Sequence, residues 1–167
     1  MITLRIVHVL SAVFWVGTLL FNAFFLFPAI TASGPSAGPV MAALQKRGMM
    51  VVLPIVGVLT ILSGYTMLWI LSGGAIGAYA ATRVGRVLTM AGGFALIGFV
   101  FGMLVARPAG IAAGKLAREL ASAGDAKQRE TLQQRLAGMQ RRLAWSSTLV
   151  TVLVVAAAVG MAVARYV

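Results

Sequence analysis

The most polar line in the apolar part of the chain starts at its single histidine. Steps of three and four residues from His8 reach Ser11, Trp15, Thr18 and Asn22, the spacing of one helix face. Polar groups at membrane depth are costly without partners, so this face should point toward other helices. The imidazole could act as an axial ligand or a proton-transfer group. The alternative is that the other polar side chains only bond neighbouring helices, and that His8 contacts water or a headgroup.

Four apolar runs must position these residues: 4–30, 50–72, 84–106 and 145–164. A helix needs about 20 residues to cross a hydrocarbon core roughly 30 Å thick. With 60% hydrophobic and 10% charged residues, the chain is predicted to be an all-α integral membrane protein, a single domain of four transmembrane helices in a bundle. A cleaved signal peptide is the alternative for the first run, but that run exceeds the about 7–15 apolar residues of such signals. With no cysteine, the chain has no disulfide, thiolate metal site or iron–sulfur cluster.

The net charge of +11 is distributed unevenly between the two sides of the membrane. Ten of the basic residues lie between spans one and two or between spans three and four: Lys46, Arg47, Arg107, Lys115, Arg118, Lys127, Arg129, Arg135, Arg141 and Arg142. The opposite side has four: Arg5, Arg83, Arg86 and Arg165. The positive-inside rule then predicts an inner-membrane protein with both termini outside. The basic loops should attract anionic lipids, and no nucleic-acid partner is expected.

The outer side predicted for His8 also gathers arginine and aromatic residues. The aromatic ones are Tyr65, Trp69, Tyr79 and Tyr166. Guanidinium groups above an aromatic pocket would suit a flat anionic ligand, such as a porphyrin with propionates. The alternative is the ordinary enrichment of these residue types at membrane interfaces. Our candidate cofactor-binding residues are therefore His8, Trp15, Arg83 and Arg86, and His8 is also the candidate metal ligand.

The connections between the spans carry local structural signals. Leucine and methionine recur at helical spacing in residues 108–143, with a break at Gly124–Asp125 where Asp125 can cap a helix. This pattern predicts a cytoplasmic helical hairpin between spans three and four. Pro39 can open a short helix over Val40–Arg47. The short glycine-rich segment 72–77 predicts that spans two and three are antiparallel neighbours.

Span three contains a GxxxG motif, formed by Gly98 and Gly102. Glycines at this spacing let another helix approach closely. The motif is predicted either to pack against a helix of the same chain or to form a homodimer face.

The segment from His8 through Trp15 to Gly17, H-x6-W-x-G, resembles the opening helix of the copper-resistance protein D (CopD) family and of the related HemJ-type protoporphyrinogen oxidases. The second span, with Pro54 followed by Gly64, is similar to their proline-then-glycine helix. The resemblance covers mainly spans one to three. In HemJ-type proteins a first-helix histidine and a third-helix lysine are associated with haem and activity. His8 matches the former, whereas this chain has Arg83 and Arg86 near the lysine position.

The resemblance and the polar helix face that starts at His8 together predict a small multi-pass membrane protein that binds haem b or a metal through His8, with no enzymatic activity assigned. One alternative is a HemJ-like oxidase activity. Another is a transporter or a structural membrane subunit. No carboxylate lies in any predicted span, since Glu119, Asp125 and Glu130 are all in the hairpin, which argues against cation transport by intramembrane acids.

Overall fold

Within the described residues, every element is helical. The computed structural model describes residues 1–167, apart from the side chain of Pro35. The α-helices are α1 (Ile2–Phe21), α2 (Phe27–Ser33), α3 (Gly38–Lys46), α4 (Met49–Leu71), α5 (Ile76–Ala81), α6 (Arg83–Phe101), α7 (Arg107–Ser122) and α8 (Ala126–Val163). Single π-helical turns join α1 to α2 at Asn22–Leu26 and α6 to α7 at Gly102–Ala106. Short 3₁₀ turns cover Gly34–Ala37 and Ala164–Tyr166.

In the part of the chain that the structure describes, four continuous helical stretches are long and apolar enough to cross a membrane: Ile2–Ser33, Met49–Leu71, Arg83–Ser122 and Ala126–Tyr166. Between 11% and 33% of the most apolar window of each is buried, so most apolar side chains face outward. Contact with lipid accounts for an exposed apolar surface of this extent. The prediction of an all-helical membrane protein with four candidate spans is therefore confirmed.

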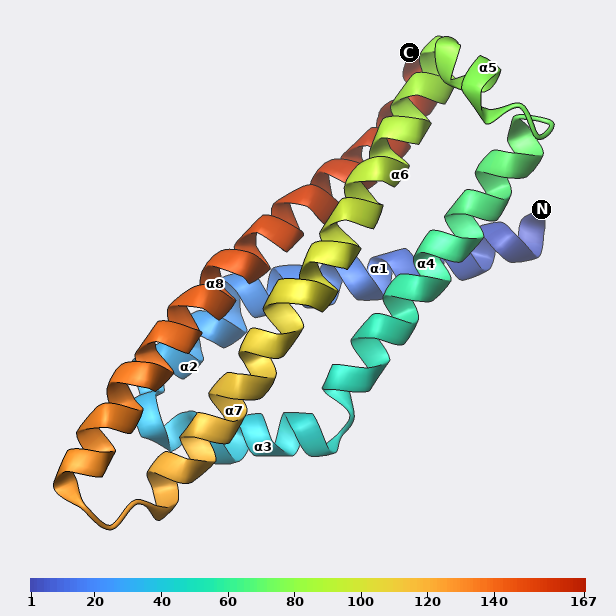
Figure 1. Cartoon of the computed structure of the whole chain (residues 1–167). Coiled ribbons are helices and arrows are strands. Elements are labelled where there is room, and N and C mark those ends of the chain that lie inside the picture. Colours follow the sequence, from blue (N-terminus) through green and yellow to red (C-terminus); the bar gives the residue numbers. More distant parts are fainter.

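The long helices pack mainly in two antiparallel pairs. In one, α1 lies against α4; in the other, the continuous α6–α7 helix lies along α8 (Figure 1). The contacts of Gly98 with Val154 and of Gly160 with Ala91 show the antiparallel register of the second pair. The prediction for segment 72–77 was incomplete. Part of it begins the short helix α5, and α6 packs more extensively on α8 than on α4.

Two of the local signals between the spans, the Asp125 cap and Pro39 at the start of a short helix, are confirmed. The Asp125 carboxylate accepts a hydrogen bond from the Gln128 backbone N–H at 3.2 Å and caps α8. Pro39 lies in the first turn of α3, which begins two residues earlier than predicted. α7 packs against the N-terminal part of α8, and α8 continues without a break through the fourth apolar run.

The core lies where the two pairs meet. Trp15 of α1 is buried with Val150 and Val154 of α8. Its indole also contacts the Phe99 ring of α6 edge-to-face, with 6.0 Å between centroids and 73° between planes. Gly57 of α4 makes room for this contact, because a Cβ there would lie 2.8 Å from the Phe99 ring. All four long helices therefore meet around Trp15.

Candidate functional site

His8 is held by α4 through one nitrogen of its ring. Nδ1 lies 2.9 Å from the Thr60 carbonyl oxygen and 3.2 Å from Ser63 Oγ. The Ser63 hydroxyl donates its own proton to the Leu59 carbonyl, at 2.6 Å. A carbonyl oxygen only accepts, so the Nδ1 position carries the proton and donates it. In the neutral imidazole this leaves a lone pair on Nε2, the atom that can bind a metal.

Two glycines of α4 receive the two aromatic rings of α1. A Cβ at Gly64 would lie 2.8 Å from His8 Cε1, and one at Gly57 would lie 3.4 Å from the Trp15 indole. His8 and Trp15 are seven residues apart, and so are the two glycines, which matches two helices running antiparallel in close contact. Any larger side chain at Gly64 would displace the imidazole.

Two residues of the predicted polar face of α1 are buried, but Ser11, Thr18 and Asn22 do not bond to neighbouring helices as one alternative supposed. Trp15 and Asn22 are each 5% exposed, which confirms that they face protein. Ser11, however, donates to the Val7 carbonyl at 2.7 Å, and Thr18 to the Phe14 carbonyl at 2.7 Å. Both hydroxyls bond within α1, because the carbonyl four residues earlier is always within reach of a helical serine or threonine.

Arg83 and Arg86 belong to the other helix pair. Both are exposed in the first turn of α6, and Arg86 donates to the Ala81 carbonyl at 3.4 Å. Among the described side chains no hydrogen bond joins either arginine to His8. The structure brings His8 together with Thr60, Ser63 and Gly64, and Trp15 with Phe99. It does not bring these two groups together with the arginines.

Histidine and carboxylate side chains do not form a ligand cluster in the described part of the chain. No group of three or more His, Asp, Glu or Cys residues is close enough to hold an ion there. Bare zinc or copper ions usually take three or four protein ligands. His8 is therefore suited to a centre that needs one protein ligand only.

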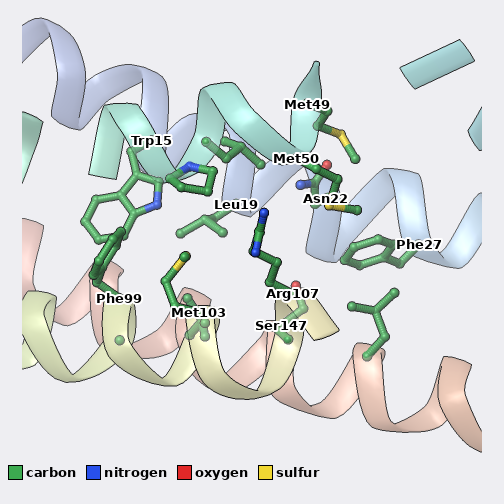
Figure 2. Close-up of a pocket in the computed structure, with 17 residues that line it drawn as sticks. Trp15, Leu19, Asn22, Phe27, Met49, Met50, Phe99, Met103, Arg107 and Ser147 are labelled. Carbon is green, nitrogen blue, oxygen red and sulfur yellow. The ribbon is translucent and has the colours of Figure 1, made fainter. Parts of the chain in front are cut away.

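Asn22 shows a second feature that the sequence did not predict. It is buried, yet within the described chain its amide forms no side-chain hydrogen bond, although an interhelical bond was expected. Its side chain lines a cavity of about 130 Å³ between α1, α4, the α6–α7 helix and α8. Figure 2 shows Asn22 on one side of this cavity and Arg107 extending toward it from the other.

Both π-helical turns border this cavity. Asn22 is the first residue of one, and Gly102, Met103 and Ala106 of the other line the wall opposite. A π turn inserts one residue into a helix and is frequent at functional sites. The remaining walls are mostly apolar: Leu19, Phe27, Met49, Met50, Leu53, Pro54, Phe99, Leu143 and Val150. We call this space the Asn22 cavity.

Replacing Asn22 by leucine is expected to leave the folded protein as stable as before or more stable. The Asn22 amide makes no hydrogen bond in the described chain that leucine would break, and leucine suits the mostly apolar walls of the cavity. Thr151→Val is the matched control, because it deletes a hydroxyl that lies 3.5 Å from the Leu19 carbonyl of α1 and 2.8 Å from the Ser147 carbonyl of its own helix. That variant should lose about 0.6 kcal/mol. Denaturant titrations in detergent would compare the two; a larger loss for Asn22→Leu than for Thr151→Val would contradict the assignment.

The GxxxG motif contacts α8 of the same chain. A Cβ at Gly98 would lie 3.1 Å from Val154 Cγ2, and one at Gly102 would lie 3.6 Å from Val150 Cγ2. These contacts favour close packing within the chain, the first of the two uses predicted for the motif. A homodimer through Gly98 and Gly102 stays a prediction.

No family model, curated protein or solved structure matches the chain. The resemblance of its first two spans to the CopD and HemJ-type proteins therefore stays a prediction, and function has to be argued from the two sites themselves.

Proposed function

We propose that this chain is a small haem-binding protein of the inner membrane in which His8 is the axial ligand of the iron. The observation that carries the proposal is the hydrogen bond of 2.9 Å from His8 Nδ1 to the Thr60 carbonyl. A histidine that binds a metal almost always donates its other ring N–H to a carbonyl, carboxylate or water. That bond fixes the tautomer and the ring orientation, so His8 is preorganised to offer Nε2 as a ligand.

The donor set favours haem over a bare metal ion. A porphyrin supplies ring nitrogens of its own to the iron, so His8 alone would suffice as the protein ligand. A bare ion would need further side-chain ligands, and the described residues hold no such cluster. Among the candidate residues, His8 would bind the iron. The structure gives Arg83 and Arg86 no contact with His8, so their pairing with the propionates stays a prediction from the sequence. The buried Trp15 supports the packing of α1 against α4 and would act on the site only through that packing.

When bound, haem would supply a redox-active iron. The residues around it perform simpler tasks. The Thr60 carbonyl oxygen accepts a hydrogen bond from the Nδ1–H group, which leaves the lone pair on Nε2. Ser63 holds the same nitrogen from a second direction, at 3.2 Å, and Gly64 leaves space for the ring.

The optical spectrum of the purified protein tests this proposal. Protein extracted in mild detergent, before and after reconstitution with hemin, should show a Soret band whose intensity saturates at one haem per chain. Metal analysis of the same sample distinguishes iron from copper. A chain that shows no Soret band even after reconstitution would contradict the proposal.

The orientation in the membrane is part of the same proposal. Ten basic residues lie on the side of the α3 segment and the α7–α8 connection, against four on the other. We therefore propose a four-helix bundle with a cytoplasmic hairpin of α7 and the start of α8, both termini outside, and anionic lipids around the basic side.

Reporter fusions are expected to show this orientation. Alkaline phosphatase fused after Val167 should be active and a fluorescent protein at that position dark, because the four outer arginines are outnumbered by the basic residues of the loops. Fusions after Gly124 in the hairpin are the control and should give the opposite pattern. A fluorescent, phosphatase-negative fusion after Val167 would contradict the topology and put His8 on the cytoplasmic side.

A further inference from the structure

The buried polar side chains of the described residues fall into two groups. Four of the six donate a hydrogen bond to a backbone carbonyl: Thr60, Ser63, Ser146 and Thr151. The other two are Asn22 and Ser147, which are 5% and 6% exposed, and neither side chain has a hydrogen-bond partner in the described chain. Both line the Asn22 cavity. Thr89 Oγ1 of α6 is also buried without a partner, but Thr89 does not line this cavity. Buried polar groups are normally paired, so two buried polar residues without side-chain hydrogen bonds in one cavity indicate a site for a polar ligand group.

The charge at this cavity is positive and unbalanced. Arg107, exposed at the start of α7, extends its guanidinium toward α1 across the cavity (Figure 2). In the described part of the chain the one ion pair joins Lys115 to Glu119, at 3.9 Å, so no carboxylate neutralises Arg107. The ligand group should therefore be an anion that accepts hydrogen bonds, such as a carboxylate, whose two oxygens can pair with the planar guanidinium.

The size and walls of the cavity define the rest of the ligand. A volume of about 130 Å³ is close to that of the engineered cavities of ~150 Å³ that admit a benzene-sized molecule. The cavity can hold a small head and a few carbon atoms. Apolar side chains such as Leu19, Leu53 and Phe99 line the part away from Arg107. A second, apolar groove shares Phe27 with the cavity and continues along α2 and α8.

We propose that the Asn22 cavity binds the carboxylate head of a single-chain amphiphile, namely a fatty acid. Arg107 pairs with the carboxylate, and the Asn22 amide and the Ser147 hydroxyl donate hydrogen bonds to it. The first methylene groups lie against the apolar walls, and the rest of the chain leaves past Phe27. Along α1 the cavity is 14 residues from His8, or about 21 Å, so the site is separate from the proposed haem site.

Tryptophan quenching by a brominated fatty acid tests this proposal directly, because Trp15 lines the cavity. The two other tryptophans, Trp69 and Trp145, are 56% and 61% exposed and can be replaced by phenylalanine. In that background, bromolaurate should quench Trp15 with a saturable curve. Arg107→Gln and Asn22→Leu should each weaken binding at least tenfold. Arg118→Gln is the matched control, since Arg118 lies on the same helix, is exposed and bonds only the Gly114 carbonyl at 3.2 Å.

Competition experiments show which class of amphiphile the cavity binds. Unbrominated laurate should displace the probe, while dodecanol, dodecyltrimethylammonium and phosphatidylglycerol should not. Displacement by phosphatidylglycerol at equal concentration would overturn the fatty acid in favour of a phospholipid, and displacement by dodecanol would overturn charge recognition. Equal quenching in all variants would mean partition into the micelle and would overturn the site. Should either variant fail to fold by circular dichroism, Ser147→Ala and Arg107→Lys provide the same comparison, with Arg107→Lys expected to retain partial binding.

Discussion

His8→Ala is expected to abolish the Soret band of the reconstituted protein, or to shift it strongly. His8 is the single histidine of the chain, so its removal leaves no imidazole for the iron. The fold should survive this change, because the hydrogen bonds of His8 join only the surfaces of α1 and α4, while Trp15 continues to hold the two helices together. The spectrum should therefore change while circular dichroism and elution volume do not.

Two further variants distinguish the role of His8 as an iron ligand from the packing of its ring against α4. Gly64→Ala keeps His8 but places a Cβ 2.8 Å from its Cε1 atom, so the ring must move away from Thr60 and the Soret band should shift or weaken. Gly17→Ala is the control in α1, since no atom lies within 4 Å of its Cβ. A His8→Ala protein with an unchanged Soret band would exclude His8 as the axial ligand, whatever happens at Gly64.

The sequence predicted what depends on composition and on neighbours along the chain. Apolar runs of sufficient length predicted the four candidate spans, and the Asp125 cap and Pro39 predicted where helices begin. It did not predict that α6 packs on α8 more than on α4, because glycines along α6 permit close approach to any partner. The two π-helical turns were not predicted either, since an inserted residue leaves the apolar character of a helix unchanged and is favoured only by tertiary contacts.

The residues of the candidate sites were predictable from the sequence only where helical spacing determines which way a side chain faces. Helical periodicity correctly placed Trp15 and Asn22 on an inward face. The partner of His8 could not be found, because the Thr60 carbonyl is a backbone atom that every residue has. One signal was present and went unused: Gly57 and Gly64 repeat the seven-residue spacing of Trp15 and His8. Arg107 and Ser147 became candidates only when the folded chain put them beside the unpaired Asn22 amide.

Gly85→Ala is expected to destabilise the protein strongly at the start of α6. A Cβ at this position would lie 1.9 Å from the Tyr79 carbonyl oxygen, a backbone atom that cannot rotate away. The Gly85 N–H also donates to Thr82 Oγ1 at 3.0 Å, so moving the backbone to relieve the clash would break the cap of α6. Overpacking of this kind costs about 3 kcal/mol, at the upper end for well-packed sites.

Gly92→Ala, seven residues further along α6, is the matched control for Gly85→Ala. No atom lies within 4 Å of its Cβ, and alanine is favoured over glycine in a helix by about 1 kcal/mol. The two identical substitutions should therefore change the free energy of unfolding in opposite directions, which thermal and denaturant unfolding in detergent would measure. Equal stability of the two variants would mean that α5 yields to the added methyl group, and that the contact between Tyr79 and Gly85 does not fix the start of α6.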